Sequence, residues 1–518
     1  MTLLRSIATV GGFTLISRGL GFVRDMLIAA VLGAGMVADA FVVAFRLPNL
    51  FRSLFAEGAF SAAFVPLFAE RLTEDGPEGA RAFSEQALGV LVTALLLFVF
   101  LFEALMPAAM YVIAPGFADE PEKFALAVLL TRITFPYLLF ISMASLMSGV
   151  LNSLGRFAAP AATPILLNLT MIGAVFGLAP FTPTPGHALA WGISAAGAAQ
   201  FAWLLVSCAQ AGMALRLSRP RLTPGVRRLL KRILPVAVGA GMYQVNLLIG
   251  TMLATLLPAG AISYLFYADR VSQLPLGVVG VAVGTALLPL VSRQIKSGDE
   301  GGALHSQNRA IEFACLLTLP AAAALIVIAQ PIVSVLFQRG AFGPAETQAT
   351  AAALAVFAAG LPAFVLVKAL TPAFFARDDT KTPIRVAGVS LAANVILNLV
   401  LMGPFRHVGI AAAATLAAWI NVAGLGVVLH RRGHLVADAR LRARLPRALL
   451  ATLLMAVCLA LADHALADVF RAPFRFRLGA LTVLVGGGLG AFALFAKLAG
   501  AAHVADLKQL FRSPGPAP

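Results

Sequence analysis

The chain has 518 residues, of which 60% are hydrophobic and only 12% charged, and its mean hydropathy is +0.90. Ordinary soluble domains are about 45–50% apolar and about 25% charged, so this composition excludes a soluble globular protein. The net charge of +16 is gathered in a few short connections. This excludes a nucleic-acid-binding face and indicates membrane topology instead.

Apolar segments long enough to cross a bilayer follow one another along the chain. A hydrocarbon core about 30 Å thick needs roughly 20 apolar residues per helix, and helices satisfy their backbone polar groups internally. The alternation typical of a β-barrel is absent, so the sequence predicts an all-α polytopic membrane protein with about fourteen transmembrane helices. The expected spans are 5–31, 36–66, 84–113, 124–152, 158–179, 187–214, 229–256, 261–292, 308–336, 347–375, 384–403, 408–430, 446–464 and 478–499.

The first span carries charges that membrane helices normally avoid. Arg18, Arg24 and Asp25 lie within it, and Gly19 and Gly21 separate the arginines. The charges interrupt any signal-peptide core, so removal of this span is not expected. A straight helix would splay the arginines by about 120°, and the glycines predict a bend or unwinding that turns both toward one cavity. In the alternative interpretation, Arg18 reaches the membrane interface and Arg24 pairs with Asp25.

The second span carries four further charges. Asp39, Arg46 and Glu57 fall within about 20° of one helical azimuth, whereas Arg52 lies about 140° away. The first three can therefore pair with one another, although a kink at Pro48 would change this phase. Each charge at the bilayer centre costs about 2.5–3.5 kcal/mol, so these side chains must face water or one another.

Two later spans add charges of the same kind. Arg270 in the eighth span shares a stripe with Ser263 and Tyr267, and Asp269 is its expected counter-ion; Lys368 lies in the tenth span. The excess of cations predicts an anionic ligand, and guanidinium groups suit phosphate in bidentate geometry. A lipid with a pyrophosphate headgroup would match both the arginines and the apolar surface.

Basic residues lie in alternate connections and predict the orientation of the chain. By the positive-inside rule these connections are cytoplasmic, and an even number of spans then places both termini in the cytoplasm. A basic group before the last span, Arg471, Arg475 and Arg477, conflicts with this assignment for the final hairpin. The two main basic groups are Arg216, Arg219, Arg221, Arg227, Arg228, Lys231 and Arg232, and Arg431, Arg432, Arg440, Arg442, Arg444 and Arg447.

Prolines and asparagines recur at an offset of 223 to 227 residues and indicate a duplication. An even number of spans per repeat preserves orientation, so two parallel-repeat six-helix lobes are expected. The predicted organisation is a lobe at 1–222, a lobe at 223–440, and two extra C-terminal helices with a tail at 441–518. The matching residues are Pro48 with Pro275, Pro66 with Pro289, Pro136 with Pro362, Pro160 with Pro383, and Asn168 with Asn394.

Several enzyme classes lack their characteristic motifs. The chain contains no Gly-Lys pair and therefore no phosphate-cradling ATPase loop. Its seven histidines are scattered rather than clustered for transferase chemistry. Cys208, Cys315 and Cys458 lie singly in apolar spans and favour packing over a disulfide or metal site. We expect no catalytic residue, metal or cofactor, and a membrane potential or an ion gradient as the driving force.

Four segments together resemble the N-terminal signature of the MurJ/MviN lipid II flippases, members of the multidrug/oligosaccharidyl-lipid/polysaccharide exporter superfamily. The resemblance extends along the chain to the loop FFARDDTKTP at 374–383, and the block 38–66 is its most specific part. The four segments are GFVRD at 21–25, ADAF at 38–41, RLPNLFR at 46–52 and EGAFSAAFVP at 57–66.

The resemblance implies two lobes around a cationic cavity, with the last two helices forming a groove for an undecaprenyl tail. It implies a non-enzymatic flippase that moves lipid II to the periplasmic leaflet of the bacterial inner membrane by alternating access, for cell-wall synthesis and cell shape. Membrane lipids and cell-wall synthesis proteins are further expected partners, and nucleic acid is not. The implied cavity residues are Arg18, Arg24, Arg52 and Arg270, with Asp39 and Lys368 as further functional charges and Asp25, Arg46, Glu57 and Asp269 supporting them.

Two alternatives and one specific hypothesis complete the prediction. A drug or cation exporter of the same superfamily would require acidic rather than arginine-rich cavity walls. A lipid-phosphate enzyme or a non-transporting scaffold is the alternative from another class. Within the flippase interpretation, Arg24 and Arg270 are expected to hold the phosphate-bearing headgroup from opposite lobes.

Overall fold

The computed structural model describes residues 3–55 and 59–501, and the regular elements within these ranges are all helical. The predicted all-α fold is therefore confirmed. The elements up to residue 255 are α1 (Leu3–Leu32), α2 (Met36–Phe55), α3 (Ala59–Glu74), α4 (Gly76–Ile113), η1 (Pro115–Phe117), α5 (Pro121–Thr134), α6 (Tyr137–Ser153), α7 (Ala158–Gly177), η2 (Ala179–Phe181), α8 (Pro185–Gln210) and α9 (Pro224–Thr255). The remaining elements are α10 (Ala261–Lys296), α11 (Glu300–Val327), α12 (Ala329–Phe337), α13 (Pro344–Phe375), α14 (Lys381–Arg431), α15 (Ala439–Ala465), η3 (Val469–Arg471) and α16 (Phe474–Leu498).

The chain divides into two compact units. The first comprises residues 1–263 with 339–342, and the second comprises 264–338 and 343–518. Helix α9, which the sequence repeat assigns to the second lobe, packs on α2, α3 and α4 and belongs to the first unit. The lobes at 1–222 and 223–440 were inferred from duplication rather than from contacts, and they remain a prediction.

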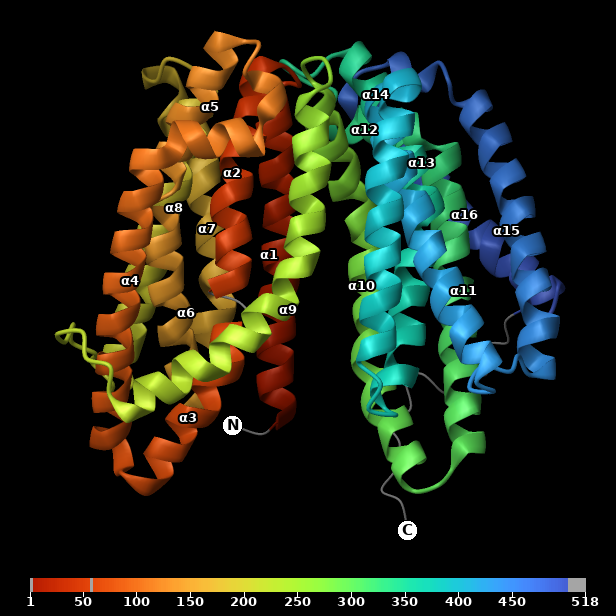
Figure 1. The fold of residues 1–518 in the computed structure, drawn as a ribbon. Helices are drawn as coiled ribbons and strands as arrows, with labels where there is room; N and C mark the ends of the chain where they lie inside the picture. Colours follow the sequence, from red (N-terminus) through yellow and green to blue (C-terminus); the bar gives the residue numbers. More distant parts are fainter. Residues whose placement is uncertain (1–2, 56–58, 502–518) are drawn as a thin grey trace. The chain divides into compact units, whose positions relative to one another are not determined.

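Helices α7 and α8 pack closely in the first unit because α8 presents small residues to its neighbours. Helix α1 lies against α7, and α8 lies against α5, α6 and α7 (Figure 1). A Cβ atom on Gly192 would come within 2.7 Å of Ala174, and one on Gly197 within 2.8 Å of Tyr137. Small residues at such contacts let backbones approach and gain dispersion energy, which holds helices together in lipid.

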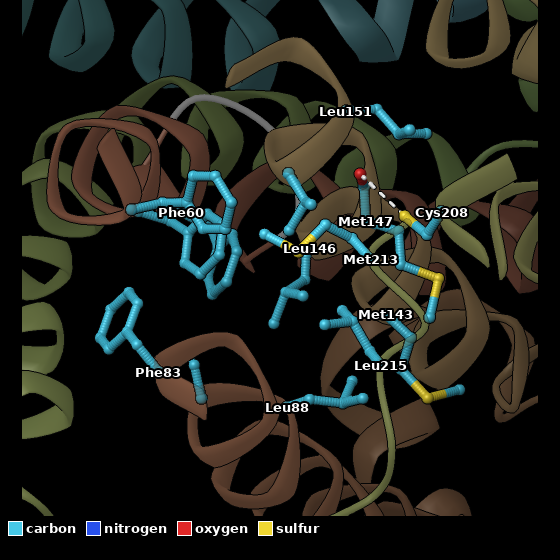
Figure 2. Packing of buried hydrophobic residues seen from close by; sticks show 14 of the residues in the cluster. Phe60, Phe83, Leu88, Met143, Leu146, Met147, Leu151, Cys208, Met213 and Leu215 are labelled. Carbon is cyan, nitrogen blue, oxygen red and sulfur yellow. Dashed lines mark hydrogen bonds between the residues drawn. The ribbon is translucent and has the colours of Figure 1, made fainter. Parts of the chain in front are cut away.

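A second contact region of the first unit is built from aromatic rings. The ring centroids of Phe60 and Phe64 are 5.3 Å apart, and those of Phe64 and Phe83 are 5.7 Å apart. Figure 2 shows this cluster together with methionine and leucine side chains from α6 and the 211–223 connection. The buried Cys208 donates from Sγ to the Met147 carbonyl oxygen at 3.7 Å, consistent with the predicted packing role.

In the second unit α13 packs on α11, α12 and α14, and α15 packs on α11 and α16. An ionic cluster joins α11 to α15, the first of the two helices beyond the predicted repeat. Glu312, which is largely buried, accepts hydrogen bonds from Arg440 at 3.2 Å and Arg444 at 2.8 Å, and it also pairs with Arg309. Because several guanidinium groups share one carboxylate, the start of α15 is fixed to α11.

Nine helical segments within the described residues are long and apolar enough to cross a membrane. The charged helices α1, α2 and α10 are not among them, so the count of fourteen stays a prediction. One of the nine is the 51-residue α14, in which Arg406 has non-helical angles of φ 49° and ψ −130°. The resulting kink falls between the predicted spans 384–403 and 408–430.

The short segment Arg339–Phe342, between α12 and α13, is part of the first unit and contacts the end of α1. Ala341 donates its backbone N–H to the Ala30 carbonyl oxygen at 2.8 Å. Gly33 and Gly340, with φ of +64° and +57°, flank this bond. A Cβ on Gly33 would lie 2.5 Å from the Ala341 oxygen, and one on Gly340 would lie 2.2 Å from the Ala30 oxygen. We call this backbone contact the α1 clasp.

Candidate functional site

Arg24 lies between α1 and α7 in a buried ion pair. Its Nε and Nη2 atoms donate to Asp25 Oδ1 at 3.0 and 2.7 Å, and its Nη1 donates to Asn168 Oδ1 at 2.9 Å. Asn168 donates from Nδ2 to the Ser17 carbonyl oxygen at 2.9 Å. Arg24 is 9% exposed and Asp25 4%. This conformation therefore has the Arg24–Asp25 pairing that the sequence left open as the alternative.

Of the bend or unwinding predicted at Gly19 and Gly21, the unwinding is wrong, because helix α1 is continuous from Leu3 to Leu32, and the bend stays a prediction. A glycine inside a helix costs only about 1 kcal/mol relative to alanine, whereas an unwound turn in lipid leaves backbone polar groups unsatisfied. Gly21 lies against Asn168, and a Cβ there would be in ordinary van der Waals contact with it, 3.5 Å from its Nδ2 atom. Arg18 is exposed on the same helix.

The arginines of α2 have separate partners. Arg52, which is half-buried, donates from Nε and Nη2 to Asn49 Oδ1 at 3.1 and 2.8 Å. Arg46 donates from Nε to Thr251 Oγ1 of α9 at 3.1 Å. Glu57, predicted to pair with Arg46 and Asp39, lies outside the described residues.

Asp39 is fully buried, and its carboxylate is bound on both oxygens. Oδ1 accepts from the backbone N–H of Ser263 at 3.0 Å and from its hydroxyl at 2.7 Å. Oδ2 accepts from the backbone N–H of Gly260 at 2.7 Å and lies 3.6 Å from Lys123 Nζ. The side chain thus joins α2, α5 and the start of α10, and it does not pair with Arg46 in this conformation.

In the second unit Arg270 and Asp269 lie half-buried on α10. The Arg270 guanidinium carbon is 4.8 Å from the Phe266 ring centroid, which is a favourable cation–π distance. Asp269 accepts a hydrogen bond from Gln273 one turn later. Tyr267, predicted on the Arg270 stripe, is 1% exposed and packs against Phe337.

Lys368 extends from α13 over a glycine of α10. A Cβ on Gly280 would lie 3.0 Å from Lys368 Nζ and 3.3 Å from its Cδ atom. A larger residue at Gly280 would therefore require the Lys368 side chain to shift by a few tenths of an ångström.

Two partners of the predicted site were missed from the sequence. Lys123 stands in an acidic stretch, Asp119 to Lys123, that was read only as a connection between spans. Asn168 was noted for its place in the repeat but not for its contact with Arg24. Long-range partners of this kind leave no local pattern, and only the unusual polar residue inside an apolar segment could have drawn attention to them.

The arginines of the candidate site are suited to binding an anionic group such as phosphate. Guanidinium groups supply fixed donors that match phosphate oxygens, and they remain charged at all physiological pH values. In the first unit Arg24 uses three of its five N–H donors on Asp25 and Asn168, and it is only 9% exposed, so an anion reaches it by rearrangement of these contacts. The arrangement fits reversible binding of an anion without a covalent step.

The comparisons with known proteins agree with this chemistry. The family model "Lipid II flippase MurJ" matches residues 28–478. A "Probable lipid II flippase MurJ" of Rhizobium meliloti (strain 1021) is 47% identical over 518 residues, covering 99% of this chain and 96% of the relative.

Two solved structures share the fold. One, described as "Lipid II flippase MurJ, inward closed conformation", has a TM-score of 0.78 and 25% identity, and covers 97% of this chain and 99% of that chain. An inward-facing multidrug resistance MATE transporter has a TM-score of 0.62 and 14% identity, and covers 80% of this chain and 94% of its own. The second likeness concerns the fold alone. From the family model and the relative identical at nearly half its positions, the chain belongs to the lipid II flippase MurJ family.

Proposed function

We propose that this chain is a flippase that moves lipid II, the lipid-linked peptidoglycan precursor, from the cytoplasmic to the periplasmic leaflet by alternating access. The observation that carries the proposal is identity of 47% across 99% of the chain to a relative named as a probable lipid II flippase. The arginines within apolar helices supply the matching chemistry for a pyrophosphate headgroup. No bond is made or broken, so the chain acts as a transporter and not as an enzyme.

Five cations form the proposed substrate-binding set: Arg18, Arg24 and Arg52 of the first unit, and Arg270 and Lys368 of the second. Because Arg24 is only 9% exposed, binding of phosphate oxygens there is expected to exchange the Asn168 contact or part of the Asp25 contact. Such an exchange couples the substrate to the packing of α1 on α7, because Asn168 lies on α7. Asp39 is already saturated by protein donors, so we assign it a role in positioning helices rather than in contacting phosphate.

The proposed location is the bacterial inner membrane, with both termini in the cytoplasm. The support is the basic connection at 211–223 and the basic residues around 431–447, which the positive-inside rule places in the cytoplasm. Thiol labelling from outside intact cells tests this orientation with Ser218→Cys in a background that lacks the native cysteines. We expect no labelling until the membrane is permeabilised, and labelling of intact cells would reverse the orientation.

Reconstitution tests the function directly. Proteoliposomes containing fluorescent lipid II should transfer it between leaflets faster than protein-free vesicles, as measured by accessibility to a membrane-impermeant quencher. A cationic dye in the same vesicles tests the exporter alternative, and mass spectrometry of the recovered lipid tests the enzyme alternative. Transport of the dye but not of lipid II, or a change in lipid mass, would overturn the proposal.

A further inference from the structure

Lys123 is a completely buried cation that contacts two carboxylates and an aromatic ring. Its exposure is 0%, and its Nζ atom lies 3.6 Å from Asp39 Oδ2 and 3.4 Å from Glu120 Oε1. The ring centroid of Phe117, itself fully buried in η1, is 4.4 Å from the same nitrogen. Glu120 is about half exposed and can be solvated without Lys123, whereas Asp39 cannot.

Two helix starts meet at the Asp39 carboxylate. Asp39 lies in the first turn of α2, and its oxygens accept the backbone N–H groups of Gly260 and Ser263 at the start of α10. Both helix N-termini carry partial positive charge and free N–H donors, and both favour an anion at this point. The carboxylate is therefore the element that fixes the first turn of α10 to α2.

The neighbouring backbone leaves this group little freedom. Gly116 of η1 donates its N–H to Thr255 Oγ1 at 3.2 Å, and a Cβ on Gly116 would lie 2.1 Å from the Thr255 carbonyl oxygen. The end of α9 is thus in backbone contact with the segment that precedes Lys123. The lysine, the carboxylate and the α9–α10 turn form one packed group within the first unit.

We propose that Lys123 is a positioning residue for transport, which holds the Asp39 carboxylate directed at the α9–α10 turn. A carboxylate with 1% exposure needs a compensating charge, and removal of one member of a buried pair leaves the other uncompensated. Helix α10 also carries Arg270, about two turns beyond Ser263. The placement of the first turn of α10 therefore affects the position of Arg270 on the same helix. The effect on Arg270 and on transport rests on the proposed function, whereas the positioning of Asp39 does not.

Hydrogen exchange of the turn tests the positioning without any transport measurement. In full-length protein in detergent, Lys123→Met should speed amide exchange in the peptide containing Gly260 and Ser263 about tenfold, because the Asp39 carboxylate that accepts from both N–H groups is displaced. Lys123→Arg retains the charge and should keep exchange near the wild-type rate. Wild-type exchange in a folded Lys123→Met protein would overturn the proposal.

A double variant keeps the test decisive if Lys123→Met fails to fold. Removing both charges of a buried pair is far less damaging than removing one, so Asp39→Asn/Lys123→Met should accumulate. Its turn should exchange at the same rate as in Asp39→Asn alone. A further acceleration in the double variant would mean that Lys123 acts independently of Asp39.

Transport adds the functional readout. In lipid II vesicles we expect Lys123→Met to lower the initial flipping rate about tenfold and Lys123→Arg to restore most of it. Lys231→Met, which removes an exposed cation from α9, is the matched control and should flip at the wild-type rate. If wild-type protein fails to flip lipid II, the proposed function is wrong but the exchange result stands. Altered exchange with unchanged flipping would overturn the role in transport.

Discussion

At the scale of single residues, the charges of this chain fall into two chemical situations. Asp39 is enclosed by protein donors on both oxygens, whereas Arg24 is held by a neighbour on its own helix and one amide from α7. A group held by an amide can exchange it for a stronger anionic acceptor at small cost. A fully enclosed carboxylate has no such route, and its contribution is to helix placement.

Substitution of Arg24 separates ligand binding from folding. Arg24→Lys keeps the charge but loses the planar fork, so we expect normal membrane abundance, weaker lipid II binding and slower flipping. Arg24→Ala removes the guanidinium that pairs with the buried Asp25 and should cost about 3–5 kcal/mol of stability. Arg24→Ala/Asp25→Asn is the control that removes both charges. Normal lipid II affinity in this folded control would contradict the assignment of Arg24 to the substrate.

Asp379, in the connection before α14, predicts a pH-dependent contribution to stability. Hydrogen bonds from the Arg432 guanidinium and from Thr382 hold the pKa of the Asp379 carboxyl well below its ordinary value. Its stabilising effect is therefore complete above the unfolded pKa of about 4 and is lost as the pH falls through the lower folded value.

We accordingly expect Asp379→Asn to lower the Tm of the purified protein at pH 7, and the difference from wild type to shrink as the pH falls toward 3. The neighbouring Asp378→Asn serves as control, since asparagine tolerates the left-handed φ of 56° there. A Tm difference that stays constant with pH would show that the carboxylate charge is not responsible.

The sequence identified the buried charges of the site but not the residues that contact them. The intrahelical charges were identified from their cost in lipid, and Arg24 and Asp39 are indeed buried. Their partners, Asn168 and Lys123, lie more than 80 residues away along the chain, and no periodicity connects them. The glycines of α1 predicted a bend or unwinding, but the requirement to satisfy the backbone in lipid keeps the helix continuous.

At the scale of elements, helix positions followed closely from apolar length and from proline and glycine. The predicted boundary after residue 403 coincides with the kink at Arg406, and the prolines matched by the repeat, Pro48 and Pro275, are each internal to a helix, α2 and α10. The predicted span 36–66 covers α2 and the first part of α3, and residues 56–58 between them lie outside the described residues.

The α1 clasp supplies a prediction at this scale. Gly33→Ala would strain a left-handed residue and place a Cβ 2.5 Å from the Ala341 oxygen, so we expect a loss of about 1–3 kcal/mol in stability. Gly35→Ala, two residues later with nothing within 4 Å of the added carbon, should be nearly neutral. Thermal melting of Gly33→Ala and Gly35→Ala measures this difference. Equal Tm values for the two variants would show that the α1 clasp does not contribute to stability.

At the scale of the whole molecule, the proposed transport carries negative charge out of a compartment that is negative inside. Each net charge moved is worth about 2.3 kcal/mol per 100 mV, unless returning arginines cancel the transfer. We therefore expect flipping in proteoliposomes to slow when the potential is collapsed at constant ion gradients. A rate that does not change would leave an ion gradient, rather than the potential, as the driving force.

The α1 clasp also has a consequence for biogenesis. The first unit needs Arg339–Phe342, so it is not complete when the ribosome has finished its ninth helix at Thr255. At about 5–20 residues per second, the missing segment follows several seconds later. During that interval the Ala30 carbonyl must keep another partner, such as water or the insertion machinery. A chain released early, before residue 342, would therefore present quality-control proteases with an unfinished first unit, although most of its sequence was already in the membrane.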